Sequence, residues 1–224
     1  MLLKPVSFLR AVTGGGGGSL ALGGTAQTNP SGNGSTISVN IPTHSSGDFI
    51  YVMLVGEEGW MSGSAPTNWT PHGQVEANAS AGRSEAKIFS YDTGTHGTLG
   101  ATAAFDSVLT NSKERAAIAW VVENQSTGLG ATTLNTDNSS SGTSATTPTV
   151  SGTSGRLLFH CWVPNSNTAG ITAPGGLTTV ENVTGNTASC LVSYETLSTT
   201  GTTTGYSAST AASQDWAVAV FEIY

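Results

Sequence analysis

Short runs of bulky apolar residues alternate with stretches rich in glycine, proline, asparagine and serine over most of the chain. The runs are about five to eight residues long and rich in β-branched and aromatic side chains, a pattern that predicts strands and not helices. Residues 49–55 are apolar at nearly every position, which is typical of a strand buried on both faces. Residues 216–224 alternate in side-chain size, as expected of a strand whose two faces meet different surroundings. The pattern therefore predicts an all-β protein.

The apolar runs occur twice in the same order, which indicates an internal duplication. Two segments match at an offset of 108 residues, and two further segments match at offsets of 103 and 100. The matched pairs are 47–54 with 155–162, 65–70 with 173–178, 88–92 with 191–195, and 117–121 with 217–221. Each half then contains about five or six strands, and the total is too large for one flat open sheet. We expect a two-layer antiparallel β-sandwich.

The duplication also predicts the domain organisation. Residues 1–24 are expected to form an N-terminal arm with a glycine-rich tether, and residues 25–224 the duplicated β-sandwich. The half-repeats are about 36–124 and 147–224, joined by the Thr/Ser-rich linker 125–146, which is either an exposed crossover or a pair of polar edge strands. The spacing fits both one sandwich and two domains, but the thin core of a single half favours one compact unit.

The first 13 residues are largely apolar and are followed by five consecutive glycines, 14–18. A signal peptide needs a continuous apolar stretch, and Pro5, Ser7 and Arg10 interrupt this one. The glycine run is typical of a flexible tether. Two hypotheses remain for the segment: an arm that docks on a partner subunit or a larger assembly, and a first strand that folds back on its own domain. The residues expected to dock are Leu3, Lys4, Val6, Phe8, Leu9 and Arg10.

Small neutral polar residues take the place of charged ones in this chain. Thr, Ser and Gly make up 91 of the 224 residues, and only 9% of residues are charged, against about 25% in a typical domain. The net charge of −7 lacks the basic character of a nucleic-acid binder. No stretch approaches the roughly 18 apolar residues of a membrane helix. We therefore expect neither a nucleic acid nor a membrane as a partner.

The sequence carries no motif for catalysis or for a cofactor. The four histidines, His44, His72, His96 and His160, lie in unrelated elements and never at the short spacing of paired metal ligands. A nucleophile elbow, a phosphate-binding loop ending in Lys-Ser/Thr, and an acidic calcium loop are all missing from the sequence. The sequence therefore nominates no catalytic residue, and we expect no metal site at the histidines.

The two cysteines, Cys161 and Cys190, are expected on neighbouring strand elements of the second half. A disulfide bond and two buried free thiols both fit this placement. Assembly in a cytoplasm favours the free thiols.

Glu57, Glu58 and Trp60 follow the first strong strand and combine an acidic pair with an aromatic residue. Such a combination resembles a fragment of a carbohydrate site, although nothing nominates the second carboxylate of a glycosidase. The alternative is a solvated loop tip with one aromatic contact. Trp69 has Leu177 at the equivalent repeat position and is expected to plug the sandwich at the Ala-Pro turn. The remaining tryptophans are expected in the core: Trp120, Trp162 and Trp216.

Several of these segments resemble a β-sandwich module that is common in virion proteins of tailed bacteriophages. In that module a Gly-Asp-Leu-Leu strand precedes a Pro-x-Gly-Trp-Thr turn, and the second half echoes the first. The matching segments are Gly47-Asp48 with its apolar strand, the Ala-Pro-Thr-Asn-Trp-Thr turn 65–70, the Ala-Lys-Ile-Phe-Ser-Tyr strand 86–91, and the strand 117–121. The resemblance covers residues 36–224. Asn68 stands where the family usually has glycine, and asparagine tolerates a positive φ better than most residues.

The resemblance implies a jelly-roll-like sandwich without enzymatic activity or cofactor, most like a capsid decoration or cement protein. Such a protein binds the outside of an assembled capsid and stabilises contacts between capsomers. The implied partners are the major capsid protein and copies of itself, with a trimer favoured. The implied location is the capsid surface of the virion, after synthesis in the host cytoplasm.

Two alternatives to a decoration protein are weighed. A tail or fibre module would bind a host receptor or a glycan through the loop of Glu57, Glu58 and Trp60. A secreted bacterial adhesion module is disfavoured, because the N-terminal segment does not read as a signal peptide.

Overall fold

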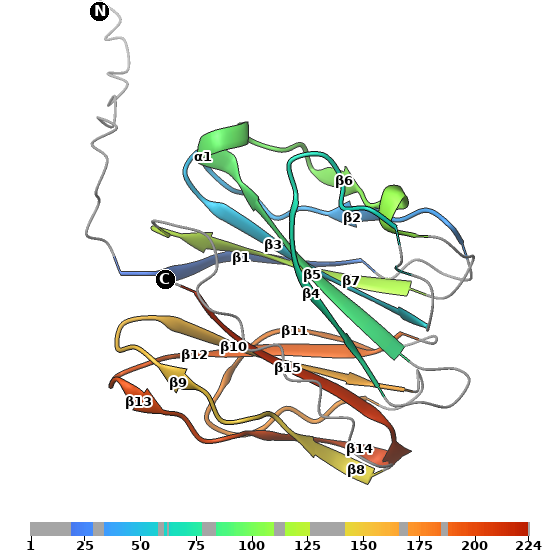
Figure 1. The fold of residues 1–224 in the computed structure, drawn as a ribbon, viewed down its shortest axis with the longest axis vertical. Helices are drawn as coiled ribbons and strands as arrows, with labels where there is room; N and C mark the ends of the chain where they lie inside the picture. Colours follow the sequence, from blue (N-terminus) through green and yellow to red (C-terminus); the bar gives the residue numbers. More distant parts are fainter. Residues whose placement is uncertain are drawn as a thin grey trace, which may run out of the picture.

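The computed structural model of the protein describes residues 19–28, 34–57, 61, 63–77, 84–109, 115–125, 142–165, 170–184 and 188–223. Its regular structure is almost entirely antiparallel strand, so the predicted all-β class is confirmed (Figure 1). The described helices are one short α-helix, α1 (Thr93–His96), and one 3₁₀ turn, Asp106–Val108. No helix in this part of the chain is long and apolar enough to cross a membrane.

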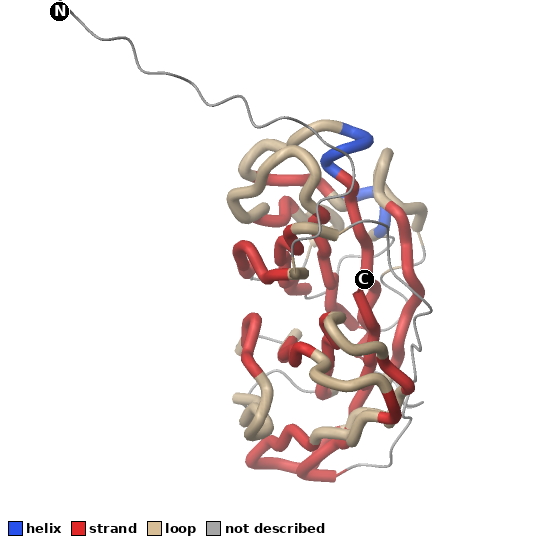
Figure 2. The backbone as a smooth tube through the Cα atoms, turned by 90° about the vertical axis from the view of Figure 1, so that its left-hand side faces the viewer, coloured by secondary structure: helices blue, strands red, loops and turns tan. Residues whose placement is uncertain are grey.

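Two large sheets lie face to face (Figures 1 and 2). The first has the strand order β1-β7-β3-β5-β4, and the second has the order β11-β12-β10-β15. The strands of the first sheet are β1 (Ala21–Thr28), β3 (Phe49–Glu57), β4 (Thr70–Glu76), β5 (Ser84–Asp92) and β7 (Arg115–Glu123). The strands of the second sheet are β10 (Leu157–Pro164), β11 (Thr178–Val183), β12 (Cys190–Thr196) and β15 (Trp216–Ile223). This pair of sheets forms the expected β-sandwich.

Two-stranded ribbons add an outer layer to each large sheet (Figure 1). β2 (Ser38–Asn40) pairs with β6 (Thr102–Ala104) outside the first sheet, and β8 (Gly142–Thr146) pairs with β14 (Ser207–Gln214) outside the second. A smaller ribbon joins β9 (Ser151–Gly152) to β13 (Gly201–Thr202). The molecule therefore has four layers: ribbon, sheet, sheet, ribbon.

The central core lies between the two large sheets and contains residues of both halves of the chain. Trp120 of the first sheet stacks on Tyr51 beside it, with ring centroids 5.6 Å apart, and on Phe159 of the second sheet at 5.4 Å. Phe159 in turn stacks on Phe221 at 5.4 Å with the ring planes only 7° apart. Offset stacking of this kind adds about 0.5–1.5 kcal/mol per pair beyond area burial. The two halves therefore share one core.

Each large sheet also buries its outer face under its ribbon. In β3, Tyr51 and Met53 face the central core, whereas Ile50 and Val52 face the outer one. The prediction that this strand is buried on both faces is confirmed. Two further predictions hold: the tryptophans of the strands are buried, and the cysteines are buried and unbonded. These residues are Trp120, Trp162, Trp216, Cys161 and Cys190. Trp69 is buried as expected, but it packs in the outer core against Tyr91 and Phe105 and not between the two large sheets.

The two sheets repeat one strand order. β7-β3-β5-β4 in the first sheet corresponds to β15-β10-β12-β11 in the second. Two turns also repeat their backbone conformation: φ is 95° at Gly47 and 83° at Gly155, and 68° at Asn68 and 90° at Gly176. These angles lie in the region that favours glycine, and asparagine occupies it more readily than other side chains do. The positive φ expected at Asn68 is therefore present.

One predicted boundary differs from the structure. The tether was expected to reach residue 24, but β1 begins at Ala21 and contains Gly23 and Gly24. At Gly23 a Cβ atom would stand 2.8 Å from a carboxylate oxygen of Glu123, so this glycine permits close packing against β7. The last residues of the expected linker 125–146 form β8 from Gly142 to Thr146, in keeping with the alternative of polar edge strands, and residues 126–141 lie outside the described part of the chain. β8 is rich in Thr and Ser and lacks the apolar alternation that marks a half-buried strand in sequence.

We predict that Phe159→Ala lowers the free energy of unfolding by about 3–5 kcal/mol, because it removes a fully buried ring from the stack between the sheets. Urea unfolding followed by tryptophan fluorescence and by circular dichroism measures the loss. Both signals are expected to change in one coincident transition, since the halves share this core. Thr179→Ala, at an exposed position on β11, is the control and should change stability by less than about 0.5 kcal/mol. Two separate transitions would contradict the shared core.

Candidate functional site

The residues expected to contact partners lie mostly outside the described part of the chain. This holds for the docking residues Leu3, Lys4, Val6, Phe8, Leu9 and Arg10, and for Glu58 and Trp60. Glu57 is the last residue of β3, where its backbone pairs with Ser84. The structure therefore does not bring these residues together into a described site.

The end of the loop that contains Glu58 and Trp60 is nevertheless fixed. Met61 is fully buried, and its backbone N–H donates to Oε1 of Glu85 at 2.6 Å. Its carbonyl accepts a hydrogen bond from Nζ of Lys87. Glu85 is itself only 2% exposed, so this anchor lies inside the protein. The loop thus runs between the end of β3 and a clamped methionine.

The cysteines show no sign of chemistry. Cys161 lies opposite Val192, and Cys190 lies opposite Val183, so the two thiols are diagonal neighbours and not a directly facing pair. Burial raises the pKa of both thiols well above 9.0. A buried protonated thiol is a poor nucleophile and a poor metal ligand.

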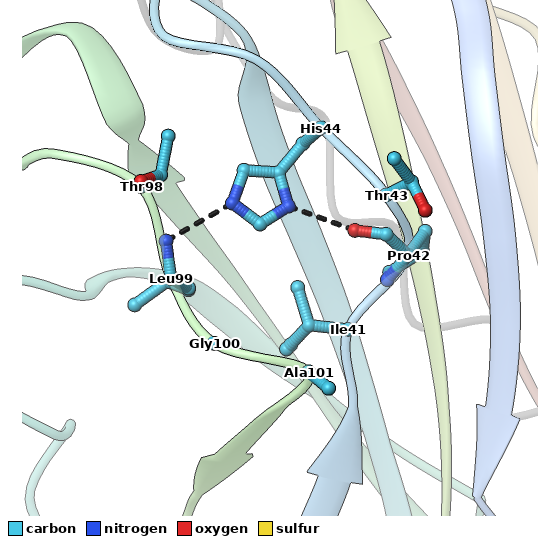
Figure 3. Close-up of a pocket in the computed structure, with 8 residues that line it drawn as sticks. All are labelled: Ile41, Pro42, Thr43, His44, Thr98, Leu99, Gly100 and Ala101. Atoms are coloured by element: carbon cyan, nitrogen blue, oxygen red, sulfur yellow. Dashed lines mark hydrogen bonds between the residues drawn. The ribbon is translucent and has the colours of Figure 1, made fainter.

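His44 ties two loops together beside a cavity of about 360 Å³ (Figure 3). Its Nε2 accepts a hydrogen bond from the backbone N–H of Leu99 at 3.0 Å, so the ring hydrogen lies on Nδ1 and is donated to the carbonyl of Pro42 at 2.8 Å. Both ring nitrogens are satisfied within the protein. His44 therefore has a structural role, and its ring offers no free nitrogen to a ligand.

Two other histidines also lack a ligand-binding arrangement. His72 lies 2.7 Å from the Ser90 hydroxyl, and burial lowers its pKa to about 4. His96 is exposed at the end of α1, where its ring meets that of Tyr91 at 5.6 Å. Within the described ranges no three His, Cys, Asp or Glu residues come close enough to hold a metal ion.

A buried polar cluster in the second half is the feature that sequence reasoning missed. It consists of Thr147, His160, Glu195 and Tyr206, and we call it the His160 cluster. His160 has no exposed side-chain surface, and its Nδ1 lies 3.1 Å from Oγ1 of Thr147. Its Nε2 lies 3.5 Å from Oε1 of Glu195, and the Tyr206 hydroxyl donates to Oε2 of the same carboxylate at 3.1 Å.

The hydrogen bonds around Thr147 indicate where the ring hydrogen of His160 lies. The backbone N–H of Tyr206 donates to Oγ1 of Thr147 at 3.0 Å, which leaves the Thr147 hydroxyl hydrogen for another acceptor. Nδ1 of His160 at 3.1 Å is closer than the Tyr206 carbonyl at 3.4 Å. We therefore assign the donation to Nδ1 and the ring hydrogen to Nε2. Nε2–H is then directed toward Glu195, at a distance too long for a strong hydrogen bond.

The His160 cluster borders a cavity of about 250 Å³. Glu195 and Tyr206 form part of the wall, and residues 196–199 and 201–204 form the rest. Burial and the adjacent Glu195 carboxylate raise the pKa of Tyr206 above 10.0, so its hydroxyl stays protonated and donates. Thr147 is only 2% exposed, so it is not placed to act as a nucleophile on a ligand. Glu195 and Tyr206 are therefore the members of the cluster that reach the cavity.

The sequence offered one partial signal for this cluster. His160 is a polar residue in the otherwise apolar run 157–163, and the equivalent position of the first half is Val52. Glu195 is equivalent to Asp92, whose role is different, because its side chain accepts from the backbone N–H groups of Gly94 and Thr95 and caps α1. Two of the four residues of the cluster, His160 and Glu195, therefore differ in type or in role from the residues that the sequence alignment of the halves places opposite them.

No protein-family model, curated protein or solved structure matches this chain.

We predict that acidification from pH 7 to pH 5 lowers the free energy of unfolding by about 2 kcal/mol through His160. Burial lowers the folded-state pKa of His160 to about 4 from 6.5, so the unfolded chain takes up the proton first. The contribution is complete above about pH 6.5 and is lost as the pH falls toward 4. Urea unfolding at both pH values measures it.

His160→Gln is the matched control for this pH dependence, because glutamine does not titrate. The variant should lose about 2 kcal/mol of the pH-dependent change and keep the part that arises from His72, whose pKa is lowered in the same direction. An identical pH dependence in the two proteins would contradict the assignment.

Proposed function

We propose that this protein is a non-enzymatic virion structural protein, a capsid decoration or cement protein that binds the outside of an assembled phage capsid. One observation carries the proposal: the strand that follows the apolar N-terminal segment is fixed to both sheets. β1 pairs with β7 in the first sheet, and Oγ1 of Thr25 donates to Oε1 of Glu181 in the second sheet at 2.8 Å. Leu20 and Leu22 pack against the central core.

A strand anchored in this way is a suitable base for a docking arm. A row of backbone hydrogen bonds joins β1 to β7, and these bonds together would resist a pull on the arm by its partner. A second contact through a tethered arm raises the effective concentration of the first contact. A protein that binds the assembled shell and not the free subunits stabilises the shell by mass action. Only 9% of the residues are charged, so salt has few ion pairs to screen, and we expect such binding to depend little on salt concentration.

The proposal includes the partners and the location. The partners are the major capsid protein and further copies of this chain, with a trimer favoured, and the location is the capsid surface. Neither nucleic acid nor membrane is a partner, in keeping with the net charge of −7.

We also propose that the fold is an internal duplication of a jelly-roll-like unit. The repeated strand order of the two sheets and the repeated φ angles at Gly47 and Gly155 support the duplication. In the first half, β1 pairs with β7 and β2 pairs with β6. Pairing of the first strand with the last, and of the second with the last but one, is the nested order of a jelly roll.

We predict that deletion of residues 1–13 abolishes co-sedimentation with capsids and leaves the sandwich folded, because β1 and everything after it are retained. The free energy of unfolding should change by less than about 0.5 kcal/mol. The full chain with Lys4→Ala and Arg10→Ala separates the roles of charge and apolar surface, and it should keep most of its binding. Undiminished sedimentation of the truncated protein would overturn the arm hypothesis.

The tail or fibre module remains a second proposal, favoured by the clamp on Met61. The described residues on either side of Glu58 and Trp60 are both held, Glu57 by its pairing in the first sheet and Met61 by its hydrogen bonds to Glu85 and Lys87. Trp60→Ala should then remove binding to host cells or to a glycan array, whereas Thr67→Ala, at an exposed position in the 65–70 turn, should not. Absence of any cell or glycan binding by the intact protein would count against this proposal.

A further inference from the structure

We propose that the cavity beside the His160 cluster binds a single neutral sugar ring, with Glu195 and Tyr206 as its polar contacts. The inference goes beyond capsid decoration and does not depend on it. The cavity lies in the second half at the end of the molecule that carries β13, away from the end of β3 where the loop of Glu58 and Trp60 starts (Figure 1).

The wall of the cavity matches the hydrogen-bonding pattern of a sugar. A sugar hydroxyl both donates and accepts, and so do the hydroxyls that line this cavity from Thr196, Ser198, Thr199 and Thr202. Tyr206 adds a ring with a polar tip, the kind of side chain that packs on an apolar ring face and keeps a hydrogen bond. Leu197 is the one aliphatic side chain larger than threonine in the wall.

Glu195 adds a carboxylate acceptor to the hydroxyl groups of the wall. Its side chain is 21% exposed, and its Oε2 already accepts from the Tyr206 hydroxyl. Its Oε1 is buried and has no hydrogen-bond partner in the described structure. A small rotation of the carboxylate toward a ligand hydroxyl would give this buried acceptor the donor that it lacks.

His160 lies beside this carboxylate without lining the cavity. Its Nε2 is also buried without a partner and faces Oε1 of Glu195 at 3.5 Å. Thr147 fixes the other side of the ring, and the ring packs edge-on against Tyr206 with centroids 5.1 Å apart. The imidazole cannot reach a ligand, because its side chain has no exposed surface.

The size of the cavity limits the ligand to one ring. Pockets that bury a drug-sized molecule measure about 300–1,000 Å³, and this cavity measures about 250 Å³.

The charged residues of the cavity wall limit the chemical class of the ligand. Among the described residues no lysine, arginine or histidine lines the cavity, so a phosphate or carboxylate ligand would meet Glu195 without a counter-charge. Glu195 is also the only acidic residue in the described wall, whereas a calcium ion needs several oxygen ligands and favours carboxylates and carbonyls.

The cavity of the first half provides an internal comparison. It is larger, at about 360 Å³, but no carboxylate lines it, and both nitrogens of His44 are used within the protein (Figure 3). The polar groups that would recognise a sugar therefore occur in one half of the repeat and not in the other.

The test uses the intact protein labelled with ¹⁵N and titrated with methyl glycosides of glucose, galactose, mannose and N-acetylglucosamine. Additions up to about 50 mM detect millimolar dissociation constants. We expect at least one glycoside to shift the amide signals of residues 195–206. Glu195→Gln should weaken binding about ten-fold or more, and Tyr206→Phe several-fold. Glu123→Gln, which removes the same charge from an exposed position, should leave binding unchanged.

Three outcomes would overturn the proposal. One is the absence of a shift in residues 195–206 with all four glycosides, and another is binding that survives Tyr206→Phe and Glu195→Gln together. The third is a response to methylammonium in place of the glycosides, which would make the cavity a cation site. Tyr206→Phe removes a single hydroxyl and tests the site if Glu195→Gln does not fold. Capsid binding should be unchanged in both variants, so this test and the arm deletion fail independently.

Discussion

The stack of aromatic rings between the two large sheets is the interaction on which the other layers depend. Trp120, Phe159 and Phe221 meet within about 6 Å of one another across the space between the sheets. Separating the sheets would expose this apolar surface and break the stacking at once. With their inner faces fixed together, the two sheets still have apolar outer faces, and each is covered by a two-stranded ribbon. The four-layer arrangement follows from sheets that are apolar on both sides.

This arrangement also decides where the His160 cluster forms. In β10, Phe159 and Cys161 point into the central core, so His160 between them points outward. On that side it meets Thr147, just after β8, and Glu195 on the neighbouring strand β12. The outer layer excludes water from the imidazole but leaves Glu195 and Tyr206 at a cavity. A polar cluster that is buried on one side and open on the other is suited to presenting fixed hydrogen-bonding groups to a ligand.

The strands that were predicted correctly are those with a strong apolar pattern. β3, β10 and β15 carry bulky residues on both faces, and burial of both faces demands such residues. β1 and β8 carried no comparable signal, because Gly, Thr and Ser fill them and their pairing depends on neighbours far away in the chain. In the same way, His160 stood out as a polar residue in an apolar run, but nothing local indicated that Glu195 and Tyr206 would meet it.

The sequence by itself determined the all-β class, the strongest strands, the positive φ at Asn68 and the burial of the tryptophans of the strands, because each follows from residue type and short-range spacing. Only the tertiary structure decided that the two halves share one core, that β1 joins the first sheet, and that one half carries a polar cavity. These features arise from contacts between residues that are distant in sequence. A local pattern does not encode such contacts, because they form only when the long chain segments between them close into loops.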